Sequence, residues 1–438
     1  MKALITTFFA LLMALPAWAE VQIEEVTSPG GITAWLVEEP SIPFTALEIR
    51  FQGGTTLDAP GKRGAIYLMT ALLEEGAADL DARAFARRQE ELAASFNYDA
   101  YDDSVSISAR FLTENRDEAV ALLRTTLHEP RFDQDAVDRV RGQVISGLMS
   151  DAKDPRDIAA SEFARLAYGD HPYASDGKGT VESVSALTRD DIVAAHRAVF
   201  ARDRLFVSAV GDITPQALGT LLDTLFADLP ATGATLPGPA EVQISGGETV
   251  IGFDVPQSVV VFGQRGIDRD DDDFFAAYVM NQILGAGGFE SRLMTEVREK
   301  RGLTYGVYSY LAPRDLAAVY MGGVSSSNDR VAEAIEVIRA EWRRMAEEGV
   351  TQKELEDAKT YLTGAYPLRF DGNSQIADIM AGMQLQRLPI DYIATRNDQV
   401  NAVTLEDVNR VAAELLDPEN LHFVVVGRPD GLDSSAGN

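Results

Sequence analysis

The sequence predicts an α+β protein built from two homologous domains, each a mainly antiparallel sheet with helices packed on one face. Three observations lead to this expectation: a repeated segment, a similar order of strands and helices in both halves, and a stretch rich in proline and glycine between them. Because strand-like segments that neighbour in sequence come first and helices follow, antiparallel pairing is favoured over a doubly wound parallel sheet. The expected domains are residues 20–228 and 248–438, joined by an extended linker at 229–247.

The repeat pairs residues 184–211 with residues 400–427 at a constant offset and without a gap. In each copy a threonine, Thr188 or Thr404, precedes an acidic turn and an apolar helix, and a β-rich segment follows and stops at glycine. Threonine at such a position is typical of a helix N-cap. Both halves are therefore expected to contain the same helix–strand unit.

The remaining elements follow from hydrophobic periodicity. In the first half, alternation predicts strands at residues 32–38, 45–52 and 104–111, and helical spacing predicts helices at 64–75 and 82–95. In the second half, strands are expected at residues 249–253, 258–264, 305–310 and 318–324, and helices at 273–284, 292–300 and from 329 onward.

The first nineteen residues are typical of a signal peptide. Lys2 precedes an apolar run, and Ala17-Trp18-Ala19 has the small-x-small pattern of a cleavage site. We therefore expect an exported chain that begins at Glu20 and resides in the periplasm of a Gram-negative bacterium. The run is too short to span a membrane, and no later segment approaches the necessary length.

Composition excludes several kinds of function. The chain of 438 residues has no cysteine, so disulfides, zinc–thiolate sites and a cysteine nucleophile are ruled out. Its 68 Asp and Glu against 39 Lys and Arg leave a formal charge of −29, which disfavours nucleic acid as a partner because phosphate backbones are repelled.

Three segments resemble the insulinase/pitrilysin family of zinc metallopeptidases, which includes the mitochondrial processing peptidase. Residues 285–293 (GAGGFESRL) and 296–305 (EVREKRGLTY) are similar to the family's C-terminal-domain signature, and residues 61–73 (GKRGAIYLMTALL) are similar to its zinc-binding helix. The resemblance implies the family's fold, in which two homologous domains form half of a clam-shell. It also accounts for the internal repeat.

The family's zinc ligands are missing from this sequence. Its chemistry needs His-x-x-Glu-His on one helix, and the matching positions carry Tyr67, Thr70 and Ala71. The third ligand of the family, a glutamate on a later helix, corresponds best to Gly147. None of the four histidines is paired at helical ligand spacing. We expect no metal or other cofactor in this chain, with zinc supplied by a partner subunit.

Other features of the family's site match. The resemblance implies that Arg298 and Tyr305 face a zinc helix across a cleft, where a guanidinium and a phenol would stabilise the oxyanion of a tetrahedral intermediate. Gly287 and Gly288 are candidates for a glycine-rich substrate loop, with a helix C-cap turn as the alternative. Asp99 and Ala100 fall in the region of the edge strand to which substrate peptides add in the family, although this segment departs from the family's Asn-Ala pattern.

These features predict a non-zinc-binding subunit of a periplasmic heterodimeric metallopeptidase. It would bind peptides or unfolded proteins, be inactive alone, and supply Arg298 and Tyr305 in trans to a homologous partner that carries His-x-x-Glu-His. Two alternatives stay open. One is a stand-alone peptide-binding or chaperone-like protein on an inactive peptidase fold, and the other is a purely structural subunit.

Overall fold

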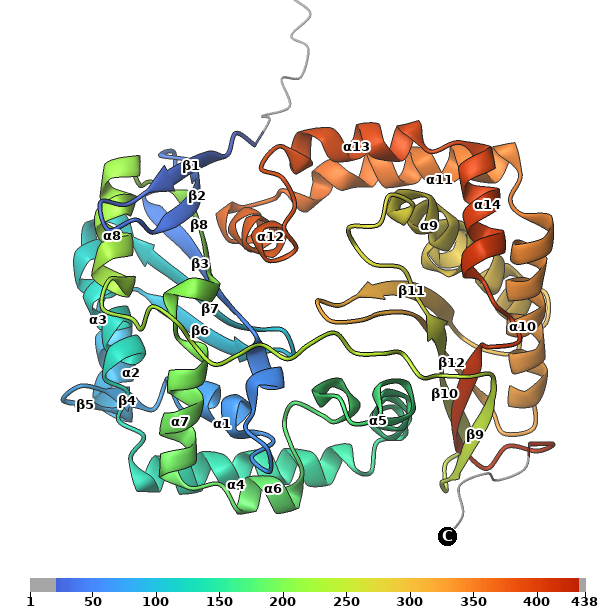
Figure 1. Ribbon diagram of the computed structural model, residues 1–438, viewed down its shortest axis with the longest axis horizontal. Helices are drawn as coiled ribbons and strands as arrows, with labels where there is room; N and C mark the ends of the chain where they lie inside the picture. Colours follow the sequence, from blue (N-terminus) through green and yellow to red (C-terminus); the bar gives the residue numbers. More distant parts are fainter. Residues whose placement is uncertain (1–20, 433–438) are drawn as a thin grey trace, which may run out of the picture.

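The computed structural model describes residues 21–432, so the predicted signal peptide lies outside the described residues. The chain forms two halves, each with its own sheet and outer helices (Figure 1). Between α8 (Pro215–Phe226) and β9 (Gly247–Gly252) it runs without helix or strand from the first half to the second. No helix within residues 21–432 combines the length and the hydropathy that crossing a membrane requires.

The first sheet has six strands in the order β1-β2-β8-β3-β7-β6. Its strands are β1 (Glu24–Thr27), β2 (Thr33–Glu38), β3 (Phe44–Gln52), β6 (Ser95–Ala100), β7 (Ser104–Leu112) and β8 (Leu205–Gly211). Every neighbouring pair is antiparallel except β2 and β8, which are parallel. A separate hairpin joins β4 (Gly76–Ala77) to β5 (Leu80–Asp81).

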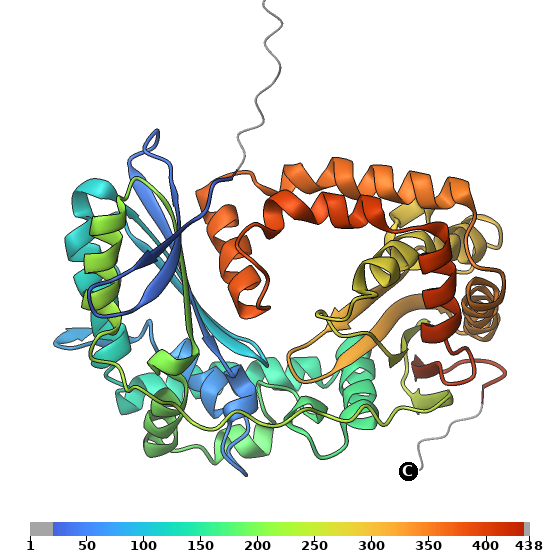
Figure 2. The same ribbon diagram turned by 45° about the horizontal axis from the view of Figure 1, so that its top comes forward.

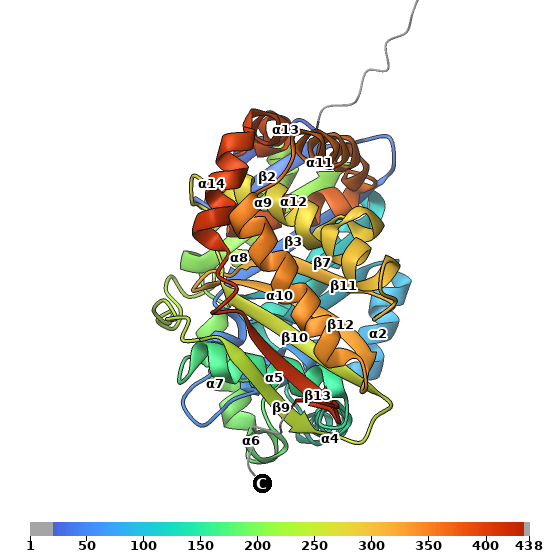
Figure 3. The ribbon, with the colours of Figure 1, turned by 90° about the vertical axis from the view of Figure 1, so that its right-hand side faces the viewer.

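The second sheet has five strands in the order β11-β12-β10-β13-β9, which lie next to one another behind α10 in Figure 3. The strands that follow β9 are β10 (Gln257–Arg265), β11 (Val307–Pro313), β12 (Ala318–Ser327) and β13 (His422–Gly427). Only β13 and β9 pair in parallel. The expected α+β class with mainly antiparallel sheets is confirmed in both halves.

The predicted repeat is confirmed as a helix–strand unit in each half. Helix α7 (Arg189–Val199) leads into β8, and α14 (Leu405–Leu415) leads into β13. Thr188 Oγ1 accepts a hydrogen bond from the Asp191 backbone N–H at 3.3 Å, and Asp191 accepts one in return from the Thr188 N–H at 2.8 Å. Thr404 and Asp407 make the same two contacts at 3.1 and 2.9 Å. Both threonines are therefore N-caps in complete capping boxes.

Helices cover the outer face of each sheet, further helices pack beside them, and together they form the two main cores. In the first half these include α1 (Ala65–Ala71), α2 (Ala82–Glu91), α3 (Arg116–His128), α4 (Gln134–Asp151) and α6 (Val181–Ser185), together with α7 and α8. In the second half they include α9 (Phe274–Asn281), α10 (Val331–Glu348), α11 (Gln352–Ala365) and α13 (Tyr392–Ala402), together with α14.

Each half also sends one helix to the inner face of the other half's sheet, which the sequence did not predict. Helix α12 (Asn373–Leu385), orange in Figure 2, lies against β3 and β8 of the first sheet, where Met380 packs on Ala46 and Val210. Helix α5 (Pro155–Tyr168) lies against β10 and β13 of the second sheet and places Phe163 in a shared apolar cluster. Each half therefore packs one of its helices on the sheet of the other half, and these contacts hold the two halves together.

Several predicted boundaries were wrong. The helix expected at 82–95 ends at Glu91, because Ala93 adopts φ 48° and the chain enters β6 at Ser95. The helix expected at 64–75 ends at Ala71. The segment expected as a helix at 292–300 contains a wide π-helical turn, and the strand expected at 305–310 begins only at Val307. Tyr305 therefore stands in a turn before β11.

Candidate functional site

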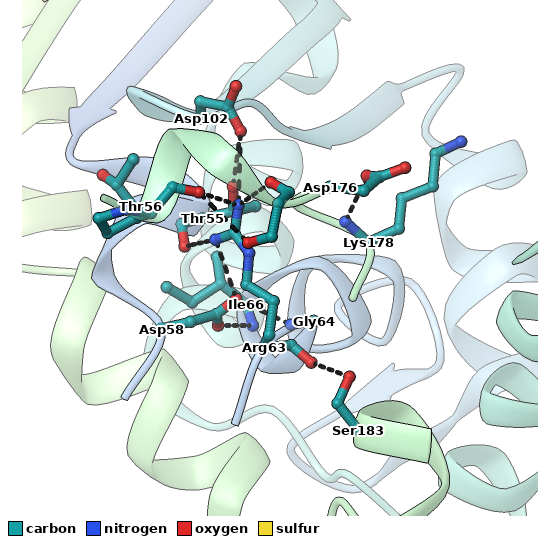
Figure 4. Close-up of polar contacts among 12 residues, drawn as sticks. Thr55, Thr56, Asp58, Arg63, Gly64, Ile66, Asp102, Asp176, Lys178 and Ser183 are labelled. Carbon is teal, nitrogen blue, oxygen red and sulfur yellow. Dashed lines mark hydrogen bonds and ion pairs between the residues drawn. The ribbon is translucent and has the colours of Figure 1, made fainter. Parts of the chain in front are cut away.

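Helix α1, which carries the degenerate zinc motif, is held at its start by Asp58 and Arg63 (Figure 4). No side chain of the helix caps it, but Asp58 accepts hydrogen bonds from the Gly64 and Ile66 N–H groups at 2.8 and 2.9 Å. Burial raises the pKa of Asp58 to about 6. Arg63 lies 3.5 Å from Asp58 and donates to the Pro172 and Ser175 carbonyls. The helix is therefore firmly positioned although it carries none of the family's zinc ligands.

The four zinc-motif positions do not fit the metal. Thr70 is 2% exposed and its hydroxyl already donates to the Ile66 carbonyl at 2.9 Å. Ala71 and Gly147 have no ligand atom, and Tyr67, half-buried on the face of Ala71, offers only a phenol. Helix α4, with Gly147, packs against α1. Among residues 21–432 no group of three or more His, Cys, Asp or Glu side chains is arranged to hold a metal ion.

Asp99 and Ala100 lie at the end of β6, one of the two edge strands of the first sheet. They face Ser106 and Val105 of β7, and no strand in the described part of the chain pairs with the other side of β6. Ala100 packs against the core of the first half, whereas Asp99 is exposed. Strand β6 also contacts α1. An extended peptide on this edge would therefore run beside the degenerate motif.

Arg298 lies on the π-helical turn Met294–Glu299 of the second half. Its guanidinium carbon stands 4.5 Å from the centre of the Phe289 ring, so the charge is held by a cation–π contact. Phe289 is itself 62% exposed. Within residues 21–432 no hydrogen bond or ion pair occupies this guanidinium, so its donors are available to a ligand.

Tyr305 projects from a fixed turn. Thr304 Oγ1 donates to the Ser325 carbonyl at 2.7 Å and accepts from the Gly306 N–H at 3.0 Å. Ser326 Oγ adds a hydrogen bond of 2.6 Å to the Leu303 carbonyl. The turn is thus tied to β12, while the Tyr305 side chain is 85% exposed. The Tyr305 phenol is therefore exposed to solvent on a backbone that hydrogen bonds hold in place.

Gly287 and Gly288 follow the π-helical turn Gln282–Ala286 and precede Phe289. Gly288 has φ 57°, which is why a glycine suits this position. A side chain on Gly287 would meet the Gln282 carbonyl oxygen at 2.6 Å. The two glycines therefore form a tight turn at the end of the helical stretch, as the C-cap alternative predicted. The next residue is Phe289, whose ring contacts Arg298.

The site residues thus form two groups, one in each half. Tyr67, Thr70, Ala71, Gly147, Asp99 and Ala100 belong to the first half, and Gly287, Gly288, Arg298 and Tyr305 belong to the second. The structure adds residues that the sequence analysis missed. Tyr308 and Tyr310, 52% and 41% exposed, stack with ring centres 6.2 Å apart on β11, the edge strand of the second sheet. Their two-residue spacing on a strand was the signal for a shared face.

Comparison with known proteins agrees with these observations. Residues 34–176 match the profile described as "Insulinase (Peptidase family M16)", and residues 186–362 match "Peptidase M16 inactive domain". A crystal structure of a peptidase M16 inactive domain from Pseudomonas fluorescens is 30% identical, superimposes with a TM-score of 0.87, and aligns over 93% of this chain and 98% of its own. The chain belongs to the insulinase family, peptidase family M16.

Curated M16 relatives are similar over nearly their whole length. The "non-peptidase homolog YmxG" of Helicobacter pylori is 28% identical over 426 residues, which cover 97% of this chain and 98% of that protein. An uncharacterized zinc protease of Streptomyces coelicolor is 28% identical over 407 residues, covering 90% and 87%. The predicted family resemblance is confirmed, and the chain is an M16 member whose zinc motif is degenerate.

Proposed function

We propose that this chain is the zinc-less subunit of a heterodimeric M16 peptidase and supplies Arg298 and Tyr305 to the zinc site of its partner. The observation that carries the proposal is the contrast between the two halves. The zinc-motif positions hold groups that do not fit the metal, whereas the Arg298 guanidinium and the Tyr305 phenol are accessible and carried by fixed backbone. A chain that has lost the zinc ligands but kept the arginine and tyrosine is what we expect if two chains each supply one part of the active site.

Arg298 and Tyr305 would act on the carbonyl group of the scissile bond. As the carbonyl carbon becomes tetrahedral, negative charge grows on its oxygen, and both side chains can donate hydrogen bonds to that atom. Phe289 restricts the guanidinium, and the Thr304 contacts restrict the turn that carries the phenol, so little reorganisation is needed. Removing one such donor typically lowers turnover by about 10²–10³-fold.

Substrate binding would use the sheet edge. The free side of β6 offers backbone N–H and C=O groups to an extended peptide, which gives affinity without strict sequence demand. The partner would be a homologous M16 subunit with His-x-x-Glu-His, and the substrates peptides or unfolded proteins. The signal-peptide pattern of residues 1–19 supports a periplasmic location for both chains.

The test is to recover the tagged chain from its native cells and to assay cleavage of a mixed peptide library by the purified complex. Cleavage that requires a co-purifying second chain and stops with a chelator is expected. Arg298→Ala and Tyr305→Phe should then lower turnover, while Arg343→Ala and Tyr361→Phe, on the surface of α10 and α11, should not. Unchanged turnover in both site variants would leave a purely structural subunit.

A stand-alone peptide-binding protein is the second candidate, favoured by the exposed Tyr308–Tyr310 stack on the second sheet edge. Under this function the chain alone would bind unfolded peptides. Substituting both tyrosines by serine would weaken that binding, and no partner or cleavage would be found. Peptide affinity that appears only in the two-chain complex would reject it.

A further inference from the structure

The second half contains a cavity of about 350 Å³ between α9, α12 and α13 that the proposed peptidase role does not use. Three arginines line it, Arg269, Arg369 and Arg396, although they are far apart in the sequence. Aromatic rings make up much of the remaining wall: Phe274, Phe275, Tyr278, Tyr366 and Tyr392. A pocket of this volume, with aromatic walls and a few convergent polar groups, is typical of small-ligand sites.

Arg396 is the innermost of the three charges and is only 4% exposed. It donates to the Leu362 carbonyl at 2.8 Å and to the Tyr278 hydroxyl at 3.2 Å, and its guanidinium lies 4.5 Å from the centre of the Tyr366 ring. All these partners are neutral. A third hydrogen bond, of 2.9 Å, goes to the neutral side-chain amide of Asn397. The donors of Arg396 are thus bonded, but no carboxylate offsets the charge of this buried guanidinium.

Arg269, which is half-buried, adds a second positive charge. Its guanidinium lies 4.2 Å from the centre of the Phe274 ring and donates to the Tyr392 hydroxyl at 2.7 Å. Arg369 stands exposed at the rim, near enough to Tyr366 to lower the pKa of that phenol, although burial dominates and raises it to about 12. Within residues 21–432 none of the three arginines forms an ion pair with a carboxylate.

One carboxylate does line the cavity, and it is already paired. Asp378, on α12, forms an ion pair with Arg50 of the first sheet. Since this contact joins the cavity wall to the inner face of the first sheet, the pocket lies next to the interface between the two halves. The local excess of arginine stands out in a chain with a formal charge of −29.

We propose that this cavity binds a carboxylate attached to an apolar or aromatic group, the chemistry of a peptide's C-terminal residue. Guanidinium groups pair with carboxylates through two parallel hydrogen bonds, and Arg269 and Arg369 have donors free for this geometry. The aromatic walls would hold the apolar body. Neither Arg298 nor Tyr305 lines the cavity, so its occupancy can be measured on this chain without a partner and without turnover.

Calorimetry on the mature full-length chain tests this. Binding of N-acetylphenylalanine is expected, and binding of its amide, which lacks the charge, is expected to be about tenfold weaker or worse. A pentapeptide that ends in phenylalanine with a free carboxylate shows whether the bound carboxylate comes from a peptide or from a free acid. If the pentapeptide binds at least as tightly as N-acetylphenylalanine, the ligand is a peptide terminus. If only N-acetylphenylalanine binds, the ligand is a free organic acid. Equal binding of acid and amide, or of inorganic phosphate and the acid, would overturn the proposal.

Variants locate the site. Arg369→Gln and Arg269→Gln should each weaken the acid by about tenfold and leave the amide unchanged. Arg369 is exposed, so its loss should not affect folding, which a thermal melt verifies. Arg83→Gln, an exposed arginine on α2 in the other half, is the matched control for net charge. If Arg369→Gln and Arg269→Gln both bind the acid as the wild type and the control do, the site is elsewhere and the proposal fails.

Discussion

Arg314, in the turn between β11 and β12, forms an ion pair with Asp102, in the turn between β6 and β7. The guanidinium also lies 4.4 Å from the centre of the Tyr173 ring, whose hydroxyl donates to Asp103 and accepts from the Leu316 N–H at 3.2 Å. The hairpin at the β6 edge of the first sheet is therefore joined to the hairpin at the β11 edge of the second sheet. This connection fixes the candidate peptide edge of one half relative to the tyrosine-lined edge of the other.

Arg314→Gln should weaken the connection between the halves. It removes a partly buried charge pair and leaves Asp102 with less compensation, so the free energy of unfolding should fall by about 1–3 kcal/mol in urea titrations. Hydrogen exchange should rise at both hairpin turns. Arg343→Gln, which breaks an exposed pair with Glu419, should change stability by less than about 1 kcal/mol. Equal effects of the two variants would contradict this role.

Introducing the family's two histidines at positions 67 and 71 should give α1 affinity for Zn²⁺. Tyr67 and Ala71 lie one helical turn apart on the same accessible face, so a Tyr67→His/Ala71→His double variant should bind Zn²⁺ through both imidazoles. Competition with a chromogenic chelator measures the affinity. Ala71→His alone should bind much more weakly, because it offers one ligand. A double variant no better than the single one would mean that the helix cannot present both rings together.

The two N-caps should contribute similarly to stability. Thr188→Ala and Thr404→Ala each leave an N3 backbone N–H without its acceptor, so each should lower the free energy of unfolding by about 0.5–2 kcal/mol. Thr360→Ala is the control, since that hydroxyl only bonds to a carbonyl of its own helix. The result would be contradicted if urea titrations gave the cap variants and the control the same stability.

Glu48 should make stability depend on pH. It is 5% exposed on the inner face of β3, accepts a hydrogen bond from Ser108 at 2.9 Å, and lies 3.6 Å from Arg50. Burial raises its pKa from 4.5 to about 7. Between these values the folded chain keeps the proton that the unfolded chain has lost, so the contribution of Glu48 to stability falls as pH rises and is constant above about pH 7.

Glu48→Gln removes this titration. Relative to wild type, the variant should gain about 1–3 kcal/mol in free energy of unfolding between pH 4.5 and pH 7, measured by denaturant titration across the range. Glu25→Gln, on the exposed face of β1, should keep the wild-type profile. Parallel profiles for wild type and Glu48→Gln would show that this carboxyl does not titrate in the window.

The sequence by itself determined the class of fold, the family and the contents of the two half-sites. These follow from local signals: the caps at Thr188 and Thr404 depend on residues three positions apart, and the alternation of β3 and β7 predicts strands. The half-buried character expected for β3 was wrong, because α12 also covers its inner face. The loss of the zinc ligands at Tyr67, Thr70 and Ala71 is visible in the sequence alone.

Only the tertiary structure decided how the halves meet and what their contacts create. The crossing of α5 and α12 depends on apolar residues of one half that fit the inner sheet face of the other, as Phe163 and Met380 do. The arginine cavity joins Arg269, Arg369 and Arg396 from separate segments, and no local pattern relates them. Sequence periodicity reports the face of a single element, whereas pairs distant in the chain become neighbours only when whole elements pack.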